Sequence, residues 1–176
     1  MRYGSTESPY MESKGEAVFS VCGRYRYSLS RRVSLTINSV CLFIMLNPSM
    51  ADASVDDPTV RRCIRFARRW NHGELRIVNL FGLIATDPRQ LESSDDPVGP
   101  DNDAALVDAL SAADTVVAAW SSRGELEQRS RQVLGLIDRL GIRVWNLGVN
   151  KTGEPRHPLY VPSRTQPAPF IRDVRV

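Results

Sequence analysis

The chain has 176 residues, of which 42% are hydrophobic and 24% charged, and its formal net charge at pH 7 is +3. This length is enough for one domain with a sizeable hydrophobic core, and the composition is typical of a globular protein. The apolar stretches fall far short of the roughly 20 residues that span a bilayer, which argues against a membrane protein. The polar first residues argue against a signal peptide. We therefore expect a flexible leader over residues 1–15 and a single cytoplasmic domain over residues 16–176.

The three cysteines, Cys22, Cys41 and Cys63, are widely spaced and form no C-x-x-C motif. An odd number in this arrangement favours reduced, buried thiols. The chain has only two histidines, His72 and His157, so it offers too few ligands for a protein-built zinc or iron–sulfur site. We therefore expect no metal and no cofactor. The modest positive charge permits a nucleic-acid partner without demonstrating one.

The first half of the chain predicts a hairpin followed by a strand, a helix and a second strand. Strand-like runs flank Gly23-Arg24 at residues 17–22 and 25–29, which favours a β-hairpin. The apolar run at residues 40–46 is typical of a buried strand. Helix-start chemistry at residues 56–59 and apolar residues at three- and four-residue spacing predict a helix from about residue 60 to 70. A strand over residues 75–81 follows.

The second half alternates helices with short buried strands. Residues 86–101 are rich in proline and aspartate and predict an ordered loop over the sheet edge. Helices are predicted over residues 101–112 and 125–140, and strands over residues 115–120 and 142–147. This order predicts an α/β fold, a single three-layer domain with a central, mostly parallel four-stranded sheet, flanking helices and an N-terminal β-hairpin.

Polar residues lie at or just after the carboxyl end of each of the four predicted strands. Asn47 ends the first, Asn79 lies in the second, Ser121-Ser122 follows the third, and residues 148–160, which include His157, follow the fourth. Ligand clefts of such sheets lie beyond the carboxyl ends of the strands. We therefore expect these residues to share one cleft.

Four motifs are similar to those of a known family. They lie at residues 45–49 (MLNPS), 56–63 (DDPTVRRC), 78–81 (VNLF) and 155–160 (PRHPLY). On these motifs the chain resembles the "domain of unknown function 1643" (DUF1643) family over residues 17–170. This resemblance implies no activity.

A more distant resemblance is to the uracil-DNA glycosylase-like superfamily. Asn47-Pro48-Ser49 resembles the Asn-Pro-Gly-type motif of these enzymes, His157-Pro158-Leu159 resembles their His-Pro-Ser-type motif, and Asn79 falls where they place a base-recognising amide. The resemblance implies a uracil-DNA glycosylase-like fold and hydrolysis of the bond between a base and its sugar in DNA. Ser49 and Leu159 depart from the usual glycine and serine, so the pocket need not fit uracil.

Hydrolysis of an N-glycosidic bond needs a base out of the stack, a positioned water and a hydrogen-bond donor for the departing base. We expect Asn47 to orient the water and His157 to donate to the base. Asp56 is the expected catalytic carboxylate, with Asp52 as its alternative, whereas Asp57 favours a helix cap. The residue types also permit a turn role for Asn47 and a structural loop role for His157.

The remaining substrate contacts are expected from residues around these motifs. Asn79 would read the edge of the base, and the other expected base-binding or substrate-binding residues are Phe81, Pro48, Ser49, Trp120 and Tyr160. Tyr160 could wedge into a base step, and both Trp120 and Tyr160 could equally be core residues.

Arginines crowd the helix predicted over residues 60–70. Arg61, Arg65 and Arg68 share a face that could follow DNA phosphates, and a solvated helix surface explains them equally well. Arg156 and Arg164 flank the His157 turn and complete the expected contacts with the DNA backbone.

The resemblance to these glycosylases thus implies a DNA glycosylase that acts on a modified or damaged base, in DNA repair or in defence against phage, and we expect it to be a monomer. The base and the strand preference stay open. One alternative is a non-catalytic module that binds nucleic acid or nucleotides. The other is an enzyme that acts on free nucleosides or nucleotides.

Overall fold

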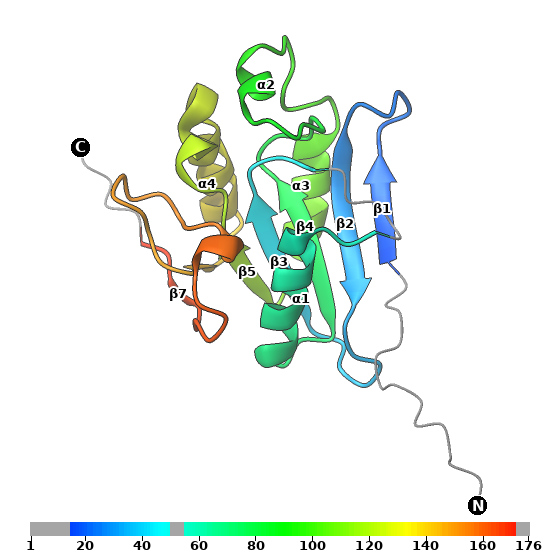
Figure 1. Cartoon of the computed structure of the whole chain (residues 1–176), viewed down its shortest axis with the longest axis vertical. Coiled ribbons are helices and arrows are strands. Elements are labelled where there is room, and N and C mark those ends of the chain that lie inside the picture. Colours follow the sequence, from blue (N-terminus) through cyan, green and yellow to red (C-terminus); the bar gives the residue numbers. More distant parts are fainter. Residues whose placement is uncertain (1–14, 50–54, 172–176) are drawn as a thin grey trace, which may run out of the picture.

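The computed structural model of the protein describes residues 15–49 and 55–171 (Figure 1). The predicted leader apart from Gly15, and also Asp52, lie outside these residues. The described strands are β1 (Gly15–Phe19), β2 (Arg26–Arg32), β3 (Val40–Met45), β4 (Glu74–Asn79), β5 (Thr115–Ala118), β6 (Val144–Asn146) and β7 (Ala168–Pro169). The described α-helices are α1 (Pro58–Arg69), α2 (Arg89–Glu92), α3 (Asn102–Ser111) and α4 (Arg129–Arg139). Two 3-10 helices, η1 (Ser122–Gln128) and η2 (Pro158–Tyr160), complete the described elements.

The strands form one mixed sheet of seven strands within the described residues, so the prediction of a four-stranded, mostly parallel sheet is wrong. The strand order is β1-β2-β4-β3-β5-β6-β7. β4, β3, β5 and β6 pair in parallel, whereas β1 with β2, β2 with β4, and β6 with β7 pair antiparallel. The predicted hairpin is not a separate appendage, because β2 continues the sheet with Leu29 opposite Ile77. Strands β2 and β7 cover edges whose backbone N–H and C=O groups would otherwise be unpaired.

Helices cover both faces of this sheet, which gives the α/β protein three layers (Figure 1). On one face, Cys63 and Phe66 of α1 pack in a core with Phe43 of β3. On the other face, Leu106 of α3 and Ile137 of α4 belong to a second core. Every residue of β3 is buried, so this central strand carries the turn at Asn47 on a rigid base.

Several helices begin near the carboxyl ends of the strands, where the site lies. Asp57 caps α1 as predicted, since its side chain accepts a hydrogen bond from the Val60 backbone N–H at 2.7 Å. The helix predicted over residues 125–140 is divided, because Gln128 has a φ of 56° and separates η1 from α4. The loop predicted over residues 86–101 contains α2. None of the helices in the described ranges is long and apolar enough to cross a membrane.

Candidate functional site

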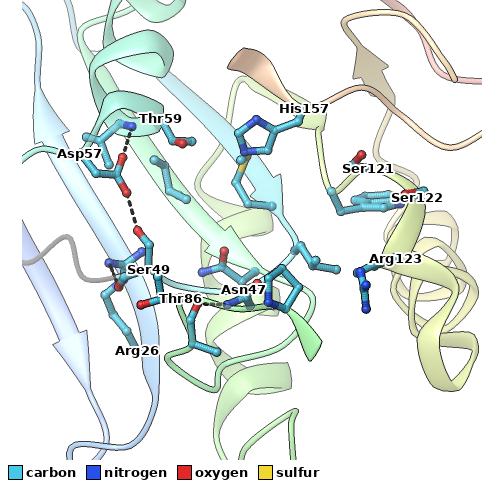
Figure 2. Close-up of a pocket in the computed structure, with 18 of the residues that line it drawn as sticks. Arg26, Asn47, Ser49, Asp57, Thr59, Thr86, Ser121, Ser122, Arg123 and His157 are labelled. Carbon is cyan, nitrogen blue, oxygen red and sulfur yellow. Dashed lines mark hydrogen bonds between the residues drawn. The ribbon is translucent and has the colours of Figure 1, made fainter. Parts of the chain in front are cut away.

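A cavity of about 340 Å³ opens at the carboxyl ends of β3, β4 and β5, where the strand order predicted a cleft (Figure 2). This volume lies near the lower end of the ~300–1,000 Å³ range of small-molecule sites. Six predicted site residues line it: Asn47, Ser49, Asn79, Trp120, His157 and Tyr160. The other polar lining residues are Arg26, Asp57, Thr59, Thr86, Ser121, Ser122 and Arg123.

Asn47 lines the cavity, and its side chain joins two loops. Its Nδ2 donates to the carbonyl oxygens of Pro48 at 3.0 Å and Ala85 at 2.7 Å. These bonds use both amide hydrogens and fix the rotation of the amide. Its Oδ1 accepts no hydrogen bond from the described residues, so it is available to a water or a substrate hydrogen. The Asn47 amide nitrogen therefore holds the turn, while the amide oxygen stays a free acceptor.

Asn79 is the last residue of β4 and lies at the buried end of the cavity. Its side chain is only 1% exposed, and its Nδ2 has no hydrogen-bond partner among the described residues. The backbone around it is held firmly, because Nδ2 of Asn102 donates to the carbonyl oxygens of Asn79 and Leu80, both at 3.1 Å. Arg129 Nε donates to the same Leu80 oxygen at 2.7 Å. A buried, unpartnered amide donor on a rigid backbone is suited to an acceptor atom of a ligand.

His157 lies over the cavity at the start of η2 (Figure 2). Its Nδ1 accepts a hydrogen bond from the Leu159 backbone N–H at 3.2 Å, so the neutral ring carries its proton on Nε2. Burial lowers the pKa of His157 below its ordinary value of 6.5, and the charge of Asp57 opposes this shift. Near neutral pH the ring is therefore an uncharged donor through Nε2–H. The Tyr160 ring, 5.4 Å from the His157 ring and 75% exposed, stands at the mouth.

Trp120 and Ser121 connect the end of β5 to the segment that carries His157. The fully buried Trp120 donates through Nε1 to the equally buried Glu154 carboxylate. Ser121 has a left-handed φ of 65°, and its backbone N–H donates to Pro155 at 2.9 Å. Left-handed backbone at a serine is strained and is common at functional sites. The two links fix the residues just before His157 against the sheet.

Asp56 and Asp57 are adjacent in sequence but lie in different surroundings. Asp56 does not line the cavity; its Oδ1 forms a 2.8 Å ion pair with the buried Arg31. Asp57 lines the cavity, and its Oδ2 accepts a hydrogen bond from the Ser49 hydroxyl. The structure therefore brings Asp57, and not Asp56, next to the other predicted site residues.

The other predicted contacts lie outside the cavity lining. Phe81 is fully buried in the core beneath α3 and α4. Side chains alternate between the two faces of the sheet only as far as Asn79, where β4 ends, so Leu80 and Phe81 both enter that core. Pro48 is buried as well, and its carbonyl oxygen also accepts from the Ala85 backbone N–H. The predicted backbone-binding arginines are all exposed but do not line the cavity: Arg61, Arg65, Arg68, Arg156 and Arg164.

Sequence reasoning missed several lining residues. Arg26 comes from β2, and its Nη1 donates to the Ser49 carbonyl oxygen at 3.4 Å. No sequence signal placed it, because the position of the hairpin beside β4 was not predicted. Thr86 lies in the proline-rich loop, and Arg123, which pairs with Glu92, follows the predicted strand end at Ser121-Ser122. Reading one residue further past that strand end would have found Arg123.

No group of three or more His, Cys, Asp or Glu side chains in the described part of the chain could hold a metal ion. The family model described as "Protein of unknown function (DUF1643)" matches residues 26–159. No curated protein and no solved structure matches the chain, so the resemblance to uracil-DNA glycosylases stays a prediction.

Proposed function

The chain belongs to the DUF1643 family, and because that family is described only by its unknown function, we propose an activity from the cavity itself: hydrolysis of the N-glycosidic bond of an extruded nucleotide in DNA. The observation that carries this proposal is the convergence of three groups in one cavity. These are the Asn47 acceptor, the buried Asn79 donor and the neutral His157.

The three groups match the three requirements of this reaction. Asn79 Nδ2 can donate to a base carbonyl or ring nitrogen, which would satisfy the only amide atom of this residue that is buried without a partner. Asn47 Oδ1 can accept from an attacking water and so orient its oxygen. His157 Nε2–H can donate to the base as negative charge develops on it. A cavity near 340 Å³ limits the ligand to a base with part of its sugar.

In the proposed reaction the C1′–N bond breaks and its electron pair leaves with the base. The water oxygen forms a new bond to C1′, and one water proton ends on the released base. The products are the free base and an abasic sugar. His157 stays uncharged in this scheme because it donates a hydrogen bond and does not transfer its proton.

The surface around the cavity supports DNA as the carrier of the nucleotide. Element η2 packs against α1, so the exposed Tyr160 ring and the exposed arginines of α1 lie on neighbouring elements. An aromatic plug beside a cavity is suited to filling the space of an extruded base, and arginines are suited to phosphates.

The test is release of a base from duplexes that carry uracil, hydroxymethylcytosine or a glucosylated base, followed by cleavage at abasic sites. We expect release from at least one duplex by the wild type, and at least a 100-fold slower release by Asn47→Ala and by His157→Ala. Asn38→Ala and His72→Ala replace the same residue types outside the cavity lining and should leave the rate unchanged. Salt-dependent binding without release would favour the binding-module alternative. Release from free nucleosides alone would favour the small-molecule enzyme.

A further inference from the structure

One side of the cavity is formed by the residues that follow β5. Ser121, Ser122 and Arg123 line the cavity there, on the side opposite Asp57 (Figure 2). The Arg123 side chain is 43% exposed, whereas Arg26, the other arginine among the described lining residues, is buried. Arg123 therefore places a guanidinium at the open edge of the cavity.

Arg123 forms an ion pair with Glu92 of α2 and so joins the end of β5 to the loop of residues 86–101. Glu92 does not line the cavity, and its side chain is 53% exposed. Asp87 lies near enough for the Arg123 charge to act on its pKa, but Asp87 pairs with Arg89, at 2.6 Å. Water and salt screen a pair as exposed as Arg123–Glu92, so this pair contributes little to the stability of the fold. An anion that binds Arg123 more strongly can therefore displace Glu92.

The proposed substrate carries such an anion to this place. An extruded nucleotide stays joined to the DNA through the phosphates on either side of it, and a cavity of about 340 Å³ holds only the base and part of the sugar. These phosphates therefore remain at the open edge of the cavity. Arginine has planar donors that match two phosphate oxygens at once, and hydrogen bonds between charged partners are strong. The predicted backbone-binding arginines of α1 do not line the cavity, so they are suited to phosphates further along the DNA.

We propose that Glu92 and DNA compete for Arg123, an inference that rests on the proposed glycosylase function. In the free protein, Arg123 pairs with Glu92. When a nucleotide is extruded into the cavity, the guanidinium leaves Glu92 and donates to a phosphate beside that nucleotide. In DNA whose bases stay stacked, no phosphate is drawn to the open edge, and Arg123 stays with Glu92. Arg123 is then a specificity-determining residue that favours extruded over stacked nucleotides.

The affinity for two duplexes measures this competition without turnover. One duplex carries a tetrahydrofuran abasic analogue, which is extruded at low cost and holds no base to release, and the other is unmodified. Arg123→Gln should weaken binding of the analogue duplex about 10-fold, because it removes a charge-assisted hydrogen bond, and should leave the affinity for the unmodified duplex unchanged. Glu92→Gln should strengthen binding of the analogue duplex about threefold, because DNA no longer has to displace an ion pair.

Glu74→Gln is the matched control, because Glu74 pairs with Arg76 at 2.7 Å but lies at the other end of β4, ~16 Å along the strand from Asn79. It should bind both duplexes as the wild type does, since the Debye length at ~0.15 M salt is ~8 Å. In the double variant Arg123→Gln, Glu92→Gln, the threefold gain should vanish, because Glu92 acts only through Arg123. A Glu92→Gln variant that binds the analogue duplex no more tightly than Glu74→Gln, or a gain that persists without Arg123, would overturn the proposal.

The base-release assay tests separately the function on which this proposal rests. Base release by the wild type, without coupling between Glu92 and Arg123 in DNA binding, overturns the competition and leaves the glycosylase function standing. No base release from any duplex, with that coupling present, overturns the glycosylase function and supports Glu92 and DNA as competitors for Arg123 in a DNA-binding module.

Discussion

Replacement of Asn79 by leucine should stabilise the ligand-free protein while it abolishes base binding. The Asn79 amide nitrogen is buried without a partner among the described residues, and the side chain is 1% exposed. Leucine has a similar shape and no polar atom, so Asn79→Leu removes the unpaired donor without opening a cavity. The backbone carbonyl of residue 79 keeps its hydrogen bond from Asn102.

The size of the effect follows from the cost of a buried, unpaired donor, which is about 1–3 kcal/mol. In a domain of this size each kcal/mol changes Tm by about 2–4 °C. We take ~1.5 kcal/mol, because the cavity admits some water, and expect a Tm increase of about 3–6 °C.

Asn102→Leu is the matched comparison, since Asn102 is a second fully buried asparagine whose Nδ2 donates to two carbonyl oxygens. Its replacement loses both bonds and relieves one unpartnered acceptor, Oδ1. We expect a net loss of ~1 kcal/mol and a Tm decrease of about 2–4 °C. Calorimetry on the ligand-free wild type and both variants measures the two shifts, and base release from duplexes measures the loss of activity in Asn79→Leu.

A Tm decrease in Asn79→Leu that equals the decrease in Asn102→Leu would refute this reasoning. It would mean that the Asn79 amide is satisfied without a ligand, and the role of Asn79 as a reader of the base would lose its physical basis.

Three further predictions concern His157, the arginines of α1 and Asp56. Base release should decline as the pH falls below 6.5, with a midpoint under that value, because burial lowers the pKa of His157 and protonation of the ring removes the acceptor for the Leu159 N–H. Neutral His157 also contributes folding stability above pH 6.5, and this contribution is lost as the pH falls through the lowered pKa. A pH–rate profile measures this, and His157→Gln should lack the decline. The double variant Arg65→Ser, Arg68→Ser should reduce the slope of log affinity against log salt by about 0.9 for each lost phosphate contact, and an unchanged slope would remove α1 from the DNA interface. Asp56→Asn should lower the unfolding free energy by about 2–3 kcal/mol, since it breaks a pair with a buried arginine; kcat measured below the new Tm should stay at the wild-type value, and a large kcat loss would restore Asp56 as a candidate catalytic residue.

The lining of the cavity by Asn47, Asn79, Trp120 and His157 could be predicted because it depends on one simple rule. Parallel strands end at the same edge of a sheet, so residues that follow each strand lie close together. The apolar runs predicted where β3, β4 and β5 lie along the chain, and therefore also predicted where each of these strands ends.

The place of Arg26 could not be predicted in this way. The sequence pattern predicted the hairpin, but which strand of the sheet it would join depends on hydrogen bonding between segments far apart in sequence. Arg26 enters the cavity because β2 pairs with β4, with Leu29 opposite Ile77. The antiparallel pairing of β2 with β4 also makes the sheet mixed.

Side-chain direction at strand ends and helix starts was also beyond the sequence. Asp56 and Asp57 are chemically alike, and only the path of the chain into α1 sends one to Arg31 and the other to the cavity. Phe81 follows Asn79 by two residues, which in a continuing strand would put both on one face. The strand ends first, so Phe81 packs in the opposite core.

The residues that line the cavity range from Arg26 to Tyr160, so nearly the whole described chain is needed to build it. A chain still emerging from the ribosome has β3, β4 and α1 long before it has His157. Complementation between fragments divided after β5 should therefore restore base release only when the two pieces associate. Under the proposed function, base release would then occur only in a completely folded chain, and a partly synthesised chain would release no base.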